Sequence, residues 1–96
     1  MTTITTSPWG KVQDQREIAD GITKVSTASH GGLLLSPERY AKMPASMKAT
    51  AYSGEGWYEE DADWALVATV FPEAFTVQQQ AFAASIMSRY FPDITA

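Results

Sequence analysis

Three features of the sequence predict an α+β domain, in which a small three-stranded antiparallel sheet in the N-terminal half packs against a buried central helix and a C-terminal helix. Residues 22–27 form a run rich in β-branched side chains, which is typical of a strand. Residues 64–71 form an almost unbroken apolar run at helical spacing. Helix-start signals at Ser36 and Thr76 place the other helices after the strands.

The three strands are predicted from turn residues and from apolar runs. Asp20-Gly21 supplies a turn that joins two strands into a hairpin over residues 11–29. A stretch ending in two glycines then breaks the β-branched run, and Leu33–Leu35 follows as a third strand. Together these strands form a small antiparallel meander.

The first helix is predicted from its capping residues. Ser36 is placed at the N-cap and Pro37 at the first helical position. The helix ends by about Met43, because the residue before Pro44 disfavours helical dihedrals. Residues 45–50 are expected to add a further turn.

The central helix is predicted from about Glu60 to Phe71. Its apolar stripe consists of Trp64, Val67, Ala68 and Phe71, at spacings of three, four and seven. Small residues line the remaining side, namely Ala62, Ala65 and Thr69. Acidic side chains at the start of such a helix complement its macrodipole. We therefore expect a helix that is buried on most of its circumference and lies across the sheet.

The last helix is predicted from a capping box. Thr76 and Gln79 have the spacing of that motif, and the helix is expected to run to about Tyr90. Its buried stripe is predicted as Phe82, Ile86 and Tyr90, with Ala83 and Met87 beside it.

The 96 residues predict a single domain over residues 9–92, preceded by a frayed N-terminus at residues 1–8. Cysteine is absent, which excludes disulfides, zinc-thiolate sites and thiol catalysis. No apolar run approaches the roughly 18 residues of a membrane span, and the N-terminus lacks the basic and apolar regions of a signal peptide. The sequence therefore predicts a soluble cytoplasmic protein with no membrane contact.

Charge is unevenly distributed along the chain. Residues 1–48 carry six basic and four acidic groups, whereas residues 49–96 carry one basic and seven acidic groups. Because Lys and Arg do not cluster, direct binding of nucleic acid is not expected. An acidic face that meets the basic surface of a protein partner is the more natural interpretation.

Four carboxylates, Glu59, Glu60, Asp61 and Asp63, are concentrated before the apolar run. Two interpretations weigh most, an acidic helix start on a solvated face and a recognition surface. Catalysis by paired carboxylates would need one group with a raised pKa in a cleft. A calcium loop would need a glycine among its ligands, and this segment has none. No metal and no cofactor is therefore predicted.

His30 is the single histidine and a candidate polar site. In the simpler interpretation it lies in a turn where its ring bonds to the backbone. In the other it acts as an acid or base with an acidic partner such as Glu59 or Asp61. An esterase-type role would require a G-x-S-x-G elbow, which the sequence lacks.

Trp9, Trp57 and Tyr58 lie outside the predicted helical stripes. Large aromatic side chains beside acids are typical of the anchors of protein interfaces. They are equally ordinary as lids on the core of a small domain, so both interpretations stay open.

Several short motifs are spread over residues 7–75: Ser7–Gly10, Ser26–Gly32, Leu35–Arg39, Met43-Pro44, Gly56–Asp61, Trp64 and Phe71-Pro72. In these motifs the chain resembles a family of small, mostly uncharacterised domains encoded by proteobacteria and their phages and plasmids. The resemblance implies a mobile-element setting, in which short acidic proteins are often inhibitors of host defence systems such as CRISPR effectors.

The leading hypothesis is a non-enzymatic, anti-CRISPR-like inhibitor, a monomer or weak homodimer that docks on the basic surface of a defence protein. Its contacts are predicted to centre on Glu55, Trp57, Tyr58, Glu59, Glu60, Asp61 and Asp63. One alternative is a small enzyme or ligand-binding domain that uses His30 with an acidic partner. Another is a structural or oligomerisation protein of a mobile element.

Overall fold

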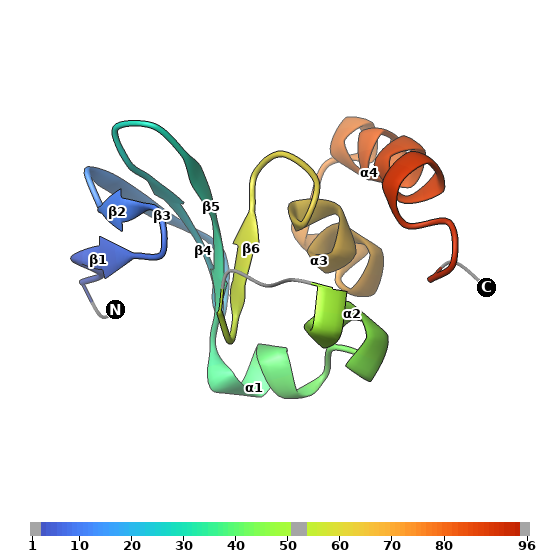
Figure 1. Cartoon of the computed structure of the whole chain (residues 1–96), viewed down its shortest axis with the longest axis horizontal. Coiled ribbons are helices and arrows are strands. Elements are labelled where there is room, and N and C mark those ends of the chain that lie inside the picture. The colour runs from blue at the N-terminus through green and yellow to red at the C-terminus, as the bar shows by residue number, and fades with distance from the viewer. Residues whose placement is uncertain (1–2, 51–53, 95–96) are drawn as a thin grey trace.

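The computed structural model describes residues 3–50 and 54–94, and its elements form an α+β fold (Figure 1). The predicted class is therefore confirmed, but the predicted three-stranded sheet is wrong. The structure has a four-stranded antiparallel sheet and a separate two-stranded sheet. Helices lie on one side of the larger sheet and the two-stranded sheet lies on the other (Figure 1).

The larger sheet has the strand order β3-β4-β5-β6. These strands span Asp14–Ala19, Ile22–Ser26, Gly31–Leu35 and Trp57–Glu59. The first three correspond to the predicted meander, and the turn between β3 and β4 contains Gly21 at a φ of 84°, a left-handed conformation that glycine adopts without strain. The fourth strand, β6, pairs with β5 and completes the sheet from a distant part of the chain.

The smaller sheet pairs β1 (Thr6–Ser7) with β2 (Gly10–Lys11). It is joined to the larger sheet by a hydrogen bond of 2.7 Å from the Ile4 backbone N–H to the Gln15 side-chain oxygen. The segment 1–8, predicted to be frayed, thus contains a paired strand, while residues 1–2 lie outside the described ranges. The N-terminal hairpin covers part of the sheet face that the helices leave open (Figure 1).

The helices follow as α1 (Pro37–Ala41), α2 (Ala45–Thr50), α3 (Trp64–Val70), the 3-10 turn η1 (Pro72–Ala74) and α4 (Val77–Tyr90). Both predicted N-caps are confirmed. The Ser36 hydroxyl accepts a hydrogen bond from the Arg39 N–H, and Thr76 and Gln79 form the complete capping box. No helix within the described ranges is long and apolar enough to cross a membrane.

The central helix is shorter than predicted, because α3 starts at Trp64 and not at Glu60. The Glu60 N–H donates to the Gly31 carbonyl oxygen at 3.0 Å, which continues the pairing of β5 with β6 and delays the helix. The buried stripe also differs. Trp64 is only half-buried, whereas Ala65, predicted on the small side, is fully buried with Leu66.

The buried stripe of α4 is likewise rotated from its predicted position. Ala83, Ile86 and Met87 are buried, at spacings of three and four. Phe82 and Tyr90, predicted at the centre of the stripe, are 62% and 58% exposed. The small Ala83 side chain permits close approach of α4 to α3, and this leaves the Phe82 ring at the edge of the interface.

The core lies between the sheet and α3. Its largest fully buried side chains are Tyr58, Ile22, Leu66 and Val67. Val25 is also fully buried, but it lies on the opposite face of the sheet, in the cross-strand row of Gly32 and Glu59. Met43 and Met47, from the segment containing α1 and α2, close the same cluster. The residue that contributes the largest fully buried side chain therefore comes from the short strand β6, and not from the central helix.

Candidate protein-binding surface

The seven residues predicted to bind a partner lie in and around β6: Glu55, Trp57, Tyr58, Glu59, Glu60, Asp61 and Asp63. Successive side chains of a strand point to opposite faces of its sheet. The segment therefore does not form the single face expected from the sequence. It divides its side chains between the core, the face covered by the N-terminal hairpin, and the exposed turn that leads into α3.

Tyr58 faces the core and has no exposed surface. Its hydroxyl donates to the Met47 carbonyl oxygen at 3.4 Å, a long hydrogen bond. Burial, followed by the neighbouring Tyr40 and Asp63, raises the pKa of Tyr58 to about 12. A side chain in this position supports β6 from beneath and cannot touch a partner.

Trp57 points to the opposite face, where it meets Trp9 from the N-terminal hairpin. The two ring centroids are 5.5 Å apart and the planes are nearly perpendicular, at 88°, a favoured geometry for aromatic pairs. Both side chains are half-buried. The pair thus covers part of the sheet, as expected of a lid. It also leaves aromatic surface exposed, as an interface anchor would require.

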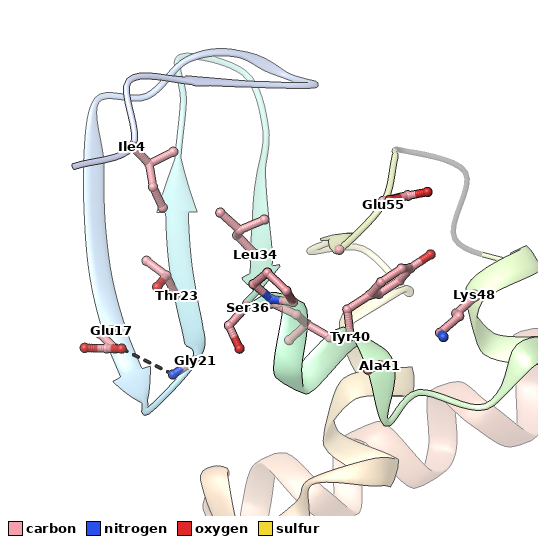
Figure 2. A pocket seen from close by; sticks show the side chains of 13 residues that line it. Ile4, Glu17, Gly21, Thr23, Leu34, Ser36, Tyr40, Ala41, Lys48 and Glu55 are labelled. Atoms are coloured by element: carbon pink, nitrogen blue, oxygen red, sulfur yellow. Dashed lines mark hydrogen bonds between the residues drawn. The ribbon is translucent and has the colours of Figure 1, made fainter. Parts of the chain in front are cut away.

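Glu55 borders a pocket of about 720 Å³ on the same face of the sheet. Figure 2 shows Glu55, Tyr40 and Lys48 on one side of this pocket, across from Ile4 and Thr23. The Lys48 ammonium lies 4.9 Å from the centre of the Tyr40 ring. Glu55 therefore lines the same pocket as a basic side chain, although the two form no ion pair.

Those four carboxylates are crowded into the end of β6 and the turn before α3. Glu60 and Asp61 are exposed, while Glu59 and Asp63 are half-buried. Among residues 3–50 and 54–94, none of the four forms an ion pair with a basic side chain. Their charge is left for solvent or for a partner to neutralise.

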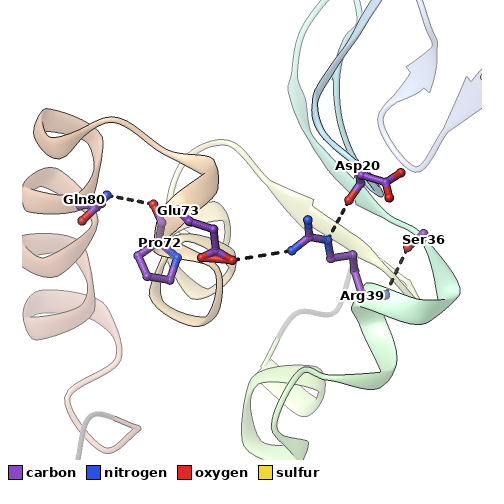
Figure 3. Close-up of polar contacts among 6 residues, drawn as sticks. All are labelled: Asp20, Ser36, Arg39, Pro72, Glu73 and Gln80. Carbon is purple, nitrogen blue, oxygen red and sulfur yellow. Dashed lines mark hydrogen bonds and ion pairs between the residues drawn. The ribbon is translucent and has the colours of Figure 1, made fainter.

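The ion pair found in the described part of the chain is elsewhere, and it is structural. Arg39 reaches Glu73 at 4.0 Å and donates to the Asp20 carbonyl oxygen at 2.8 Å (Figure 3). Its guanidinium also lies 4.7 Å from the centre of the Phe71 ring. Arg39 thereby links three elements: α1, the turn between β3 and β4, and η1.

Asp63 is the carboxylate most constrained by its surroundings. Burial and the nearby Glu59 carboxylate raise its pKa above the ordinary 3.8, and a hydrogen bond with the Glu59 backbone acts in the opposite direction. The Trp57 N–H is bound by the Gly54 carbonyl oxygen at 3.1 Å. β6 is an edge strand, so its unpaired backbone groups could pair with a strand of another chain. The contacts to the Glu59 backbone and to the Trp57 N–H occupy two of these groups.

We expect Asp63→Asn to raise the melting temperature at pH 7. The folded-state pKa of Asp63 lies above 3.8, so the wild-type domain loses stability as pH rises from 3.8 through that pKa. Asparagine carries no charge, and its amide oxygen accepts the same type of bond. Thermal unfolding from pH 3 to 7 should show the advantage of the variant vanishing below pH 3.8. A lower melting temperature for the variant at pH 7 would contradict this.

His30 lies in the turn between β4 and β5 with its side chain exposed. Its backbone N–H donates to the Thr27 hydroxyl at 3.1 Å, and its carbonyl oxygen accepts from the Thr27 hydroxyl at 2.7 Å. The turn is thus held by the backbone of His30, and its ring makes no hydrogen bond or ion pair with a described residue. Within the described ranges, no three metal-ligating side chains converge.

The family described as "Domain of unknown function (DUF7007)" matches residues 2–95. The chain belongs to this family. No curated protein and no solved structure was found to match the chain. The DUF7007 match covers nearly all of the sequence and supports the expected membership of a small uncharacterised family, and its description assigns no activity.

One feature of this DUF7007 domain was not predicted from the sequence. A groove of about 350 Å³ lies between the helix-side face of the sheet and the helices, lined by Trp64, Phe75 and Phe82 among others. These rings come from α3, from the loop after η1 and from α4. The signal that could have found it is Phe82, because shifting the buried stripe by one residue to the small Ala83 leaves the Phe82 ring outside the core.

Proposed function

We propose that the domain is a non-enzymatic protein-binding inhibitor of a host defence nucleoprotein complex, of the anti-CRISPR kind. The observation that supports this most directly is the group of four carboxylates after Tyr58 that no basic side chain of the described structure neutralises. Such a surface gains most by docking on a basic partner, because opposite charges steer association and fix orientation.

CRISPR effectors hold guide and target strands in positively charged channels that recognise the nucleic acid through its backbone. An acidic domain seated on such a channel competes with target DNA without binding DNA itself. Glu60 and Asp61 are the exposed carboxylates that would make these contacts, with Glu59, Glu55 and the Trp57 ring at the margin. In this proposal the domain acts in the host cytoplasm as a monomer or weak homodimer.

Tyr58 and Asp63, both among the residues first assigned to partner binding, have a different part in the proposal. Tyr58 anchors β6 in the core, and Asp63 contacts the Glu59 backbone at the free edge of that strand. Each positions the exposed carboxylates, so substitutions at these two residues would confuse a change in the stability of the fold with loss of binding.

The test is a charge reversal at the two exposed positions, Glu60→Lys with Asp61→Lys. Purified domain would be titrated against a panel of CRISPR effectors of different types, with target-DNA binding read by fluorescence anisotropy. We expect at least one effector to lose DNA binding at stoichiometric domain. The reversed variant should inhibit it about tenfold or more weakly, and wild-type inhibition should weaken as salt rises.

The matched control reverses two exposed carboxylates outside β6 and the turn that follows it, Glu38→Lys on α1 with Asp93→Lys after α4. It changes the net charge by the same amount as the test variant. It should therefore retain inhibition if binding depends on the carboxylates at Glu60 and Asp61 and not on net charge alone. Equal inhibition by the reversed variant and the wild type, with both folded by circular dichroism, would reject the acidic surface. Failure to inhibit any effector of the panel would reject the CRISPR target.

A further inference from the structure

The groove beneath α4 adjoins the acidic turn and shares only Glu60 with it. Its floor is apolar, made by Ile18 and Leu33 on the helix-side face of the sheet. Its far wall is aromatic, formed by Trp64, Phe75 and Phe82. The volume of about 350 Å³ is at the lower end of ligand pockets, so the groove suits a small ligand of about a dozen heavy atoms.

The aromatic wall is assembled but incompletely covered. The Trp64 ring centroid lies 6.0 Å from that of Phe75 and 5.9 Å from that of Phe82, and the rings are tilted by 42° and 47°. Phe82 is 62% exposed and Trp64 is half-buried. A further ring placed in the groove would extend this cluster and would remove exposed aromatic surface from water.

Two opposite charges line the same groove without meeting. Lys24 stands on β4 beside Leu33, its cross-strand neighbour, and Glu60 follows β6. No ion pair joins Lys24 to Glu60 or to another acid among the described residues. A ligand that carries both an anionic and a cationic group therefore finds a group of opposite charge for each in the lining of the groove.

We propose that this groove binds a free aromatic amino acid. Its ring packs against Trp64 and Phe82, its carboxylate meets the Lys24 ammonium, and its ammonium meets the Glu60 carboxylate. In a free aromatic amino acid, the ammonium and the carboxylate are both attached to the α-carbon, which also bears the aromatic side chain. A residue in the interior of a peptide carries neither charge. The inference goes beyond the proposed inhibitor function and does not depend on it.

The test is an NMR titration of ¹⁵N-labelled domain with L-phenylalanine. The three tryptophan indole N–H signals serve as reporters, because Trp64 lines the groove while Trp9 and Trp57 pair on the opposite face of the sheet. We expect the Trp64 signal to shift with a Kd of about 1 mM or tighter, given the efficiency of ligands of this size. Shifts confined to Trp9 and Trp57, or no shift at about 10 mM ligand, would overturn the proposal.

Analogues separate the contributions of the two charges. L-phenylalaninamide lacks the carboxylate and 3-phenylpropionate lacks the ammonium, and each should bind about three- to fivefold more weakly than phenylalanine. Lys24→Gln should remove the preference for phenylalanine over its amide, whereas the control Lys11→Gln, on the N-terminal hairpin, should keep it. Equal binding of phenylalanine and 3-phenylpropionate would exclude a free amino acid and indicate the carboxyl end of a peptide.

The aromatic wall has its own matched pair of variants on α4. Phe82→Ala should weaken binding by about three- to tenfold. Val77→Ala removes another exposed apolar side chain of the same helix, 80% exposed, and should leave the Kd unchanged. Equal weakening by both would overturn the placement. Because Lys24 and Phe82 lie outside the carboxylates proposed to inhibit an effector, failure of this site leaves effector inhibition intact, and the reverse also holds.

Discussion

Replacing Tyr58 by alanine is expected to lower the free energy of unfolding by about 3–5 kcal/mol, the usual range for truncating a large buried aromatic residue. Tyr58 has no exposed surface and stands opposite Leu33 in the pairing of β5 with β6. Its removal leaves a cavity beneath the three-residue strand β6. Urea unfolding followed by circular dichroism measures the loss. An unfolding free energy within about 1 kcal/mol of wild type would mean that the ring is not in the core.

Tyr58→Phe is the control that separates packing from the hydroxyl group. It keeps the ring and removes only the 3.4 Å bond to Met47, so a loss of about 1 kcal/mol or less is expected. The two proteins should also differ in alkali. The pKa of Tyr58 rises from 10.0 in the unfolded chain to about 12 in the fold. Wild type therefore loses stability as pH rises from 10 to 12, and the phenylalanine variant lacks this component.

Parts of the fold governed by neighbouring residues could be predicted from sequence. The turn at Gly21, the N-cap at Ser36 and the capping box at Thr76 each depend on contacts within a few residues, and all three are present. Strand β6 could not be predicted in this way. It is three residues long, and it exists because Trp57–Glu59 pairs with β5, more than twenty positions earlier.

The missed strand also explains why the predicted partner-binding residues separate. In the loop expected before a helix that starts at Glu60, Trp57, Tyr58 and Glu59 would all lie near one solvated segment. In a strand they alternate, so Tyr58 enters the core while Trp57 joins Trp9 on the other face. The charge pattern predicted the exposed carboxylates Glu60 and Asp61, because charge at a loop needs no long-range information.

The groove, like β6, depends on a tertiary contact that the local sequence pattern does not contain. Periodicity placed Phe82 in the buried stripe of α4, whereas the structure buries Ala83, Ile86 and Met87 and leaves Phe82 exposed. The position of the stripe depends on the depth at which Ala83 packs against α3, a tertiary contact. The local pattern therefore predicts that the helix has a buried face. The packing of α4 against α3 determines which aromatic residue stays exposed at the edge of the interface and lines the groove.

Gly32→Ala is expected to destabilise the domain by about 3 kcal/mol through overpacking. A Cβ at this position would lie 2.5 Å from the Trp9 ring carbon Cη2 and 2.5 Å from the Tyr58 carbonyl oxygen. The ring can move, but the carbonyl belongs to β6 and is held by the pairing of β5 with β6. Even a single methyl group must therefore push β6 away from β5 or distort both strands.

The background Trp9→Ala tests which of the two contacts dominates. Without the ring, Gly32→Ala should cost less than in the wild type, and the difference measures the contact with Trp9. A substantial loss should remain, because the Tyr58 carbonyl is still 2.5 Å from the added carbon. Urea unfolding of the wild type, the two single variants and the double variant gives the cost of the contact with Trp9 and the cost that remains without it. If the alanine were neutral once Trp9 is removed, β5 and β6 would have to be more adaptable than their pairing implies, and the carboxylates that follow β6 would be less firmly positioned for a partner.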